Sequence, residues 1–234
     1  LKDGFTTAFE YSDCWVEDSR LVVLNARDAE AHGADILTRT RVTEARRVGD
    51  LWQITLEGGG TLRTVEARVL VNAGGPWVAD IIRNVARQNS SESVRLVRGS
   101  HIVTRKLYDH DKAYFLQGPD GRIIFAIPYE GDFTLIGTTD ADHDGDPRAA
   151  ICTAAERDYL LDFANRYFAQ DVTQDDIVWT FSGVRPLYDD GAQSATAATR
   201  DYVLSLDDRG GVLLNVFGGK ITTYRKLAED ALAK

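Results

Sequence analysis

Apolar residues recur with helical spacing in some stretches of the chain and alternate with polar residues in others. Glu17-Asp18-Ser19 supplies acidic residues for the first turn of a helix that is predicted to run to about His32, and Gly33 ends it. Aromatic and β-branched residues alternate roughly over 5–16, and 34–38 has the length of a short buried strand after the helix, so a strand is predicted on either side. The first forty residues are therefore expected to form a β-α-β unit.

The pattern from 41 to 65 changes to three short strands. Gly49-Asp50 and Gly58-Gly59-Gly60 supply the turns, so a small antiparallel meander is expected. A compact apolar strand over 67–72 then runs into a glycine turn. Pro76 suits the first turn of a helix, and the apolar residues after it have helical spacing.

Strands dominate the stretch 94–139, where glycine-containing turns predict the hairpins of an antiparallel sheet. A helix is expected over 153–168. A strand at 178–181 is expected to end in a loop at Arg185, and a last apolar strand over 211–217 leads through a glycine pair into the final helix.

These elements predict an α/β plus α+β chain with two interleaved parts. One part is a three-layer nucleotide-binding domain that the chain visits at both ends, and the other is a central antiparallel sheet with one helix. The expected division is 1–92 for the first visit, 93–207 for the sheet domain and 208–234 for the return.

Charge and composition exclude several classes of protein. The chain has 27 basic and 36 acidic residues, and the net charge of −9 argues against general nucleic-acid binding. No run of about 20 apolar residues exists to span a bilayer, which leaves peripheral attachment open. Cys14 and Cys152 are expected to be reduced and partly buried. The acidic run 140–146 lacks the glutamate that closes an EF-hand loop, so no metal site is expected.

The strongest candidate for a binding site is the run 217–226, in which a strand, a glycine pair and a hydroxyl-rich helix start follow one another. The first N–H groups of a helix are unpaired and attract anions or polarised carbonyls, and glycine lets a ligand approach the backbone. A tight turn with a threonine cap explains the same spacing equally well. Asn72-Ala73-Gly74-Gly75-Pro76-Trp77 is a second such turn, for which packing alone is the favoured explanation.

Two arginines also indicate a binding site for an anion. Arg185 lies in an apolar, small-residue context and keeps its charge, so it needs a negative partner. A surface ion pair with Asp189 or Asp190 is the competing explanation. Arg200, beside Asp201, has the same two explanations.

His101 enters a strand among apolar neighbours. A pKa near neutrality would suit it for proton transfer. The alternative is a hydrogen-bonded histidine with a structural role.

Several runs in one order along the chain carry a family resemblance. The most specific are Gly137-Thr138-Thr139-Asp140, Ser182-Gly183-Val184-Arg185-Pro186-Leu187 and Gly218-Gly219-Lys220-Ile221-Thr222-Thr223-Tyr224-Arg225. Together they resemble the FAD-dependent glycerol-3-phosphate dehydrogenases of the D-amino-acid-oxidase-like flavoprotein superfamily, over essentially the whole chain. The resemblance implies a Rossmann-like FAD/NAD(P)-binding domain, here partial, and a substrate domain on the antiparallel sheet.

The resemblance also implies a reaction. Hydride passes from C2 of sn-glycerol 3-phosphate to flavin N5, dihydroxyacetone phosphate forms, and the electrons pass to membrane quinone. Arg185, Arg200, His101 and Lys220 are implied around the substrate. His101 or a group held by Arg185 would be the base, Arg185 and Lys220 would stabilise oxyanion charge, and Arg200 would help to hold the phosphate.

The same resemblance implies where FAD lies. The backbone of one residue would lie near adenine, three residues near the middle of the cofactor, and four at the pyrimidine edge of the flavin. In that order they are Val42; Ala73, Gly74 and Trp77; and Gly219, Lys220, Ile221 and Thr222.

The family's G-x-G-x-x-G turn is expected before Leu1 and its helical domain after Lys234. We therefore expect this stretch, as an internal fragment, to bind FAD weakly or not at all and to be inactive. The parent protein is expected in the cytoplasm, peripheral to the inner membrane, and the resemblance allows a homodimer. The alternatives are a related FAD-dependent amine or 2-hydroxy-acid oxidase and a non-catalytic ligand-binding module.

Overall fold

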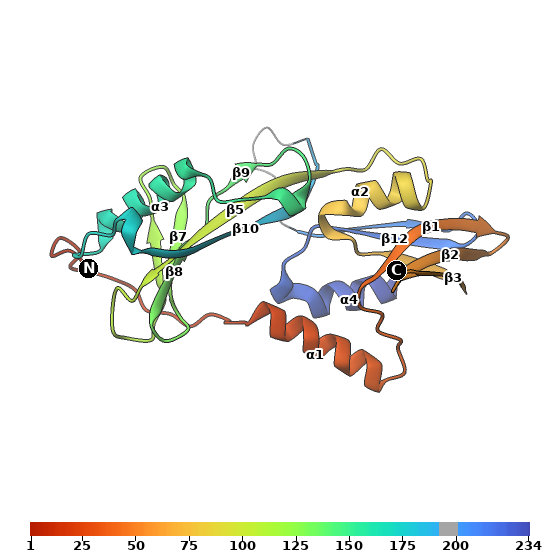
Figure 1. Ribbon diagram of the computed structural model, residues 1–234, viewed down its shortest axis with the longest axis horizontal. Coiled ribbons are helices and arrows are strands. Elements are labelled where there is room, and N and C mark those ends of the chain that lie inside the picture. The colour runs from red at the N-terminus through yellow and green to blue at the C-terminus, as the bar shows by residue number, and fades with distance from the viewer. Residues whose placement is uncertain (192–200) are drawn as a thin grey trace. The chain divides into compact units, whose positions relative to one another are not determined.

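The computed structural model describes residues 1–191 and 201–234 (Figure 1). The described chain divides into two compact units. Unit 1 contains 1–11 and 95–185, and unit 2 contains 12–94, 186–191 and 201–234. The assignment of flavin binding to 1–92 and 208–234, and of substrate binding to 93–207, stays a prediction.

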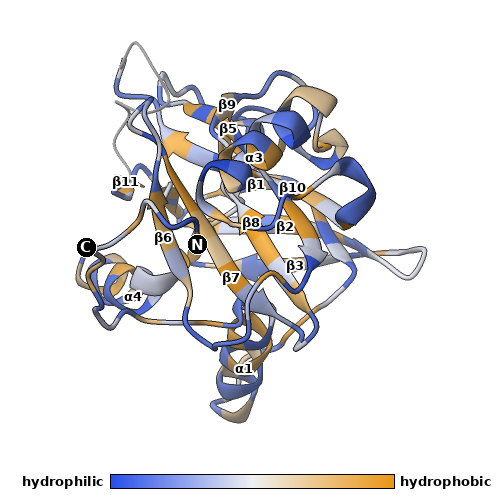
Figure 2. Ribbon diagram, turned by 90° about the vertical axis from the view of Figure 1, so that its left-hand side faces the viewer, coloured by the Kyte–Doolittle hydropathy of each residue, from blue (hydrophilic) through white to orange (hydrophobic). Residues whose placement is uncertain are grey.

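Unit 1 is built on a six-stranded sheet with the order β10-β5-β8-β7-β6, in which β9 also pairs with β5. Its strands are β5 (Val94–Arg105), β6 (Tyr114–Gln117), β7 (Ile123–Tyr129), β8 (Phe133–Gly137), β9 (Ala141–Asp142) and β10 (Ile177–Tyr188). Two short 3-10 turns, η3 (Pro147–Ala149) and η4 (Gln174–Asp176), lie between strands. Strands β7 and β8 consist largely of hydrophobic residues (Figure 2).

Helix α3 (Ala154–Tyr167) covers one face of this sheet. It begins at Thr153, whose side chain and that of Glu156 form a reciprocal capping box. The shared core includes Ile102, Ile124, Ile136, Leu160 and Phe163. Full burial of each such side chain stabilises the fold by roughly 1.5–3 kcal/mol.

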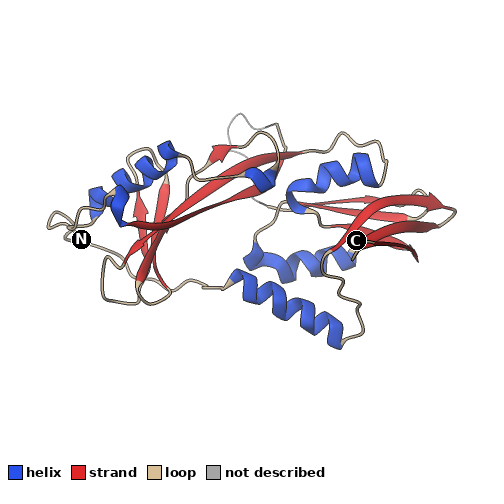
Figure 3. Cartoon of the chain, in the orientation of Figure 1, coloured by secondary structure: helices blue, strands red, loops and turns tan. Residues whose placement is uncertain are grey.

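Unit 2 contains two three-stranded sheets, drawn in red in Figure 3. One is the antiparallel meander of β1 (Thr40–Val48), β2 (Leu51–Gly58) and β3 (Thr61–Ala67). The other has the order β11-β12-β4, from β4 (Val69–Asn72), β11 (Val203–Asp207) and β12 (Val212–Phe217). Strand β12 runs antiparallel to β11 and parallel to β4.

Unit 2 also contains several helical segments. They are α1 (Asp18–Ala31), η1 (Gly75–Trp77), α2 (Val78–Asp80), the π-helical η2 (Ile81–Val85), η5 (Ile221–Thr223) and α4 (Tyr224–Ala233). Among the described helices, none is both long and apolar enough to cross a membrane. Trp52 and Leu213 centre one core cluster of this unit, and Val78, Ile82 and Phe217 form another.

Most predicted elements are confirmed, including the meander, the helix over 153–168 and the strand before the last helix. The strands predicted at 5–16 and 34–38 are wrong, because no strand forms in either segment. A strand needs a hydrogen-bonding neighbour, and Phe9 and Trp15 are 93% and 76% exposed. Arg185 is also not in a loop, since β10 continues through it.

Candidate functional site

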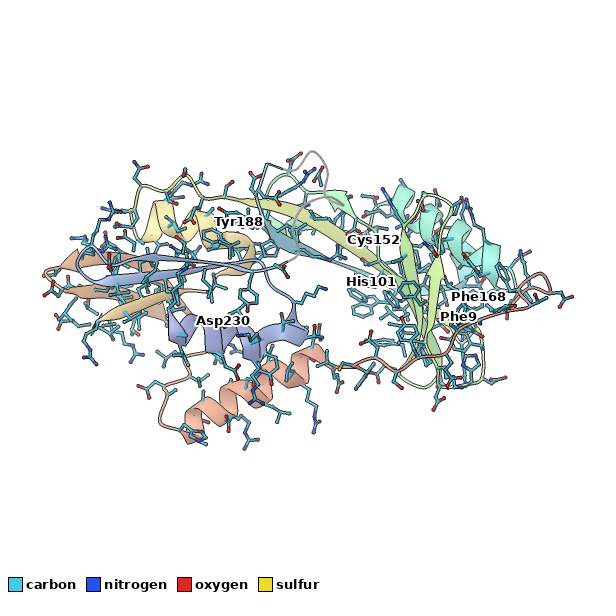
Figure 4. All side chains as sticks on the ribbon, turned by 180° about the vertical axis from the view of Figure 1, so that it is seen from behind. Phe9, His101, Cys152, Phe168, Tyr188 and Asp230 are labelled. Atoms are coloured by element: carbon cyan, nitrogen blue, oxygen red, sulfur yellow. The ribbon has the colours of Figure 1, made fainter. Side chains whose placement is uncertain are left out.

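His101, labelled in Figure 4, and Arg185 lie on the face of the unit 1 sheet opposite to α3. Side chains alternate across a strand, and Ile102 packs into the core with α3, so the neighbouring His101 points the other way. The Arg185 guanidinium lies over Gly99, which belongs to the same strand as His101. The face thus carries a histidine and an arginine from two neighbouring strands, β5 and β10.

Two glycines make room for these side chains. Gly137 lies opposite His101 in the β5–β8 register, and a Cβ atom there would be 2.2 Å from His101 Cδ2. A Cβ atom on Gly99 would be 2.4 Å from Arg185 Nη2. Both distances are far below van der Waals contact, so these strand glycines mark a close approach of side chains to the sheet.

The surroundings of His101 keep its ring neutral. Its ring stacks on Phe181, with centroids 4.7 Å apart and planes 8° from parallel. Burial, followed by the charge of Arg185, lowers the pKa of His101 to about 4, so the expectation of a pKa near neutrality is wrong. Its Nδ1 atom is buried and has no hydrogen-bond partner within the described ranges.

Arg185 is oriented by the residues that follow β8. Its guanidinium forms an ion pair with Asp140, and its Nη2 donates to Thr138 Oγ1 at 3.0 Å. The predicted alternative, a pair with Asp189 or Asp190, is wrong; Asp189 instead accepts a hydrogen bond from Ser93. The Arg185 side chain stays 33% exposed and can still meet a ligand.

Arg200 lies outside the described residues. Lys220 belongs to unit 2, where it is exposed at the start of η5.

Two parallel strands of unit 2 end at one edge of their sheet. Asn72 and Asn215 are paired in the β4–β12 register, and each strand then enters a glycine turn and a helical segment. Gly218 and Gly219 have φ angles of 71° and 99°, which other residues rarely adopt. Helix starts beyond the carboxyl ends of parallel strands are the usual place for a nucleotide cofactor in α/β sheets.

A buried asparagine pair holds this edge together. Asn72 Nδ2 donates to Asn215 Oδ1 and to the Val78 carbonyl, both at 3.0 Å. The pair fixes β4, β12 and the start of α2 against one another. Sequence patterns singled out the turn after Asn72 but missed Asn215, whose apolar run gives no sign of a buried amide.

The residues implied around FAD are open to a ligand. All but Gly74, which is partly exposed, are exposed: Val42, Ala73, Trp77, Gly219, Lys220, Ile221 and Thr222. A Cβ atom on Gly74 would be 2.3 Å from Ile81 Cδ1, so this glycine also serves packing. Positive-φ glycines, exposed residues and two helix starts at one sheet edge fit an FAD site.

The remaining candidates have structural partners. Asp142 pairs with Arg95 at 2.7 Å, and Asp146 pairs with Arg148 at 2.7 Å. No group of three or more His, Cys, Asp or Glu suited to a metal is found in the part of the chain that the structure describes. Cys152 is buried, whereas Cys14 is exposed, contrary to the expected partial burial.

Known proteins resemble this chain in sequence and in fold. The family model described as FAD dependent oxidoreductase matches residues 1–225. A glycerol-3-phosphate dehydrogenase of Pseudomonas aeruginosa is 52% identical over 100% of this chain and 46% of its own length. A D-erythritol 1-phosphate dehydrogenase of Brucella abortus is also 52% identical, over 99% of this chain and 47% of its own. The chain therefore spans about half the length of the curated relatives it matches.

A solved structure shows the same fold. The glycerol-3-phosphate dehydrogenase from Bacillus halodurans, complexed with FAD, superposes with a TM-score of 0.79 at 32% identity. The match covers 93% of this chain and 42% of that one. The expected mixed fold of an FAD-binding domain interleaved with an antiparallel sheet is confirmed by this likeness.

Proposed function

The chain belongs to the family of FAD dependent oxidoreductases, and we propose that it carries the substrate pocket of an enzyme that oxidises sn-glycerol 3-phosphate to dihydroxyacetone phosphate. The observation that carries this proposal is the pair of His101 and Arg185 on one open sheet face, each lying over a glycine. The names of relatives that match the whole chain support the substrate class.

The reaction removes a hydride and a proton from the C2 carbon and its hydroxyl group. FAD, when bound, supplies the hydride acceptor. The His101 ring is neutral, because its pKa lies at about 4, and it would accept the hydroxyl proton through whichever ring nitrogen is unprotonated. Arg185, held by Asp140 and Thr138, stabilises the negative charge that develops on the oxygen.

The proposal assigns two further cations to the substrate. Lys220 joins Arg185 in stabilising the oxyanion, and Arg200 binds the phosphate through its planar pair of donors. The anionic phosphate would also counteract the effect of Arg185 on His101 and raise its pKa in the bound state, which favours proton transfer.

The proposed FAD site combines the meander with the edge of β4 and β12. The Val42 backbone binds adenine, Ala73, Gly74 and Trp77 line the middle of the cofactor, and residues 219–222 hold the flavin edge. The full or partial exposure of these residues and the two helix starts support this assignment.

A four-carbon polyol phosphate is a second candidate substrate. The Brucella relative that is 52% identical bears the name of a D-erythritol 1-phosphate dehydrogenase. Both candidates present a phosphate and a secondary alcohol, so the same cations and the same base serve either.

Substrate choice is tested in the flavin-loaded, full-length protein. We expect turnover with sn-glycerol 3-phosphate or D-erythritol 1-phosphate, and kcat/KM identifies which is preferred. Amines and 2-hydroxy acids serve as controls for a related oxidase, and preference for either would overturn the proposal. Unchanged ligand affinity after Arg185→Ala and Lys220→Ala would instead indicate a non-catalytic binding module.

The electron acceptor, the location and the assembly of the parent enzyme form part of the same proposal. Electrons pass from flavin to membrane quinone, and the enzyme is a cytoplasmic protein, peripheral to the inner membrane, that can form a homodimer. Quinone reduction by vesicle-bound protein, compared with protein alone, tests the first two statements.

A further inference from the structure

A buried carboxylate lies behind the proposed pocket, on the α3 side of the sheet. Glu156, in the first turn of α3, is only 8% exposed. Its Oε1 atom accepts hydrogen bonds from Ser100 Oγ and Thr139 Oγ1, both at 2.9 Å, and from Arg98 Nε at 3.2 Å. Its Oε2 atom accepts from the Thr153 backbone and hydroxyl at 3.0 and 2.8 Å, and pairs with Arg98 Nη2 at 3.1 Å. We call these residues the Glu156 network.

The network joins three segments of unit 1. Arg98 and Ser100 come from β5, Thr139 follows β8, and Thr153 caps α3, which contains Glu156. Ser100 Oγ lies 2.8 Å from Ser182 Oγ, which extends the network to β10. A hydrogen bond also joins Ser100 directly to Thr139, because the Ser100 backbone N–H donates to Thr139 Oγ1 at 2.9 Å.

Each link is next in sequence to a group on the opposite face. Ser100 lies between Gly99 and His101, and Ser182 follows Phe181, on which the His101 ring stacks. Thr139 lies between Thr138 and Asp140, the two residues that orient Arg185. The network therefore holds the three segments that present the proposed catalytic groups.

We propose that Glu156 is a positioning residue, which locks β5, β10 and the segment after β8 in the register that orients His101 and Arg185. The proposal rests on the proposed function only for the role of those two side chains in catalysis. Their placement is tested without substrate or flavin.

The negative charge matters because three different kinds of donor converge on it. Burial alone would raise the pKa of Glu156, but the hydrogen bonds from Thr153, Arg98 and Ser100 outweigh burial and lower the pKa to about 2. A glutamine at this position can keep the bond from the Thr153 N–H through its carbonyl oxygen. Its NH2 group would then face Arg98 Nε, Ser100 Oγ and Thr139 Oγ1, which lose their acceptor, and Arg98 loses its charge partner.

The test uses the ring signals of His101 in NMR spectra of ¹³C-histidine-labelled protein, assigned by comparison with His101→Gln. Stacking on Phe181 shifts these signals, so they report the position of β5 relative to β10. Glu156→Gln breaks the sheet side of the network. Thr153→Ala is the matched control, because it weakens the helix cap and leaves the contacts of Arg98, Ser100 and Thr139 in place.

We expect Glu156→Gln to move the His101 signals toward those of an exposed histidine and to raise its pKa, while Thr153→Ala leaves both unchanged. Ser182→Ala, which keeps the buried charge and its cap, should shift the signals in the same direction by a smaller amount. The proposal is overturned if His101 is unchanged in both Glu156→Gln and Ser182→Ala, or if Thr153→Ala disturbs it equally. None of these outcomes depends on the identity of the substrate.

Discussion

At the scale of single residues, the close approach of glycines to reactive side chains is the main feature of unit 1. The contacts that orient these side chains join residues far apart in sequence, such as Arg185 with Asp140 and His101 with Phe181. Each pair depends on strand order and on which side chains share a face.

Gly137→Ala should therefore disturb the proposed site directly. The new methyl group would lie 2.2 Å from the His101 ring, so the ring must leave its stacked position. We expect a loss of stability of about 1–3 kcal/mol, typical of overpacking, together with a large loss of turnover in the flavin-loaded protein. Urea unfolding and steady-state assays measure the two effects.

Gly183→Ala is the matched control for this substitution. Gly183 also lies in a strand of the same sheet, but a Cβ atom added there would have no neighbour within 4 Å among the described residues, and the φ of Gly183 is not positive. Its variant should retain turnover. Equal losses of stability and turnover in the two variants would show that contact between the new methyl group and His101 is not their cause.

Residue patterns predicted His101, Arg185 and the glycine turns as candidates, because each stands out from its local sequence. They could not predict that Asp140 rather than Asp189 pairs with Arg185, since a neighbour 45 residues away is brought close only by the fold. They also gave the wrong pKa for His101, because burial and the guanidinium charge are tertiary effects.

At the scale of elements, local signals explain which parts of the fold could be predicted. The turns of the meander and the capping box of α3 are encoded within a few residues of each other, and the meander and this helix were both predicted at the right places. The strands expected at 5–16 and 34–38 do not form, because alternation creates a strand only where another strand is available to pair.

The start of α3 should make stability depend on pH. The folded pKa of Glu156 lies below its ordinary value of 4.5, at about 2, so its stabilising effect is complete above pH 4.5 and is lost as pH falls toward 2. After an allowance for solvent screening, the loss is about 2 kcal/mol. Urea unfolding between pH 6 and 3 should show a steeper decline for wild type than for Glu156→Gln, and parallel curves would refute the assignment.

The edge formed by β4 and β12 should depend on its asparagine pair. Asn215→Ala removes the acceptor of one Asn72 N–H and opens a small cavity, at a cost of about 1–3 kcal/mol. Asn84→Ala is a control, because the Asn84 bond to Asp80 is exposed. Thermal unfolding of both variants measures the difference between their losses of stability. This difference should vanish if water replaces the buried contact.

At the scale of the whole molecule, the proposed substrate groups belong mainly to unit 1 and the proposed cofactor edge belongs to unit 2. Within the described residues, the chain passes between the units near Tyr11, near Arg95 and near Arg185. The proposed reaction requires His101 and Arg185 of unit 1 to serve the same substrate as Lys220 of unit 2.

The 234-residue chain by itself should be colourless after desalting. Its sequence contains no G-x-G-x-x-G turn to hold the pyrophosphate of FAD, and the edge of β4 and β12 supplies only part of a cofactor site. The absorbance spectrum of the purified chain mixed with FAD measures this. Stoichiometric flavin in the desalted protein would contradict it.

The central claim is that Arg185 and His101 act on a polyol phosphate beside the flavin. The most direct measurement is the anaerobic bleaching of flavin absorbance when sn-glycerol 3-phosphate or D-erythritol 1-phosphate is mixed with the full-length, flavin-loaded protein. We predict rapid bleaching in wild type and bleaching slower by a factor of about 10²–10³ in Arg185→Ala with its flavin retained. Flavin that stays oxidised with both substrates, or an Arg185→Ala variant that bleaches at the wild-type rate, would contradict it.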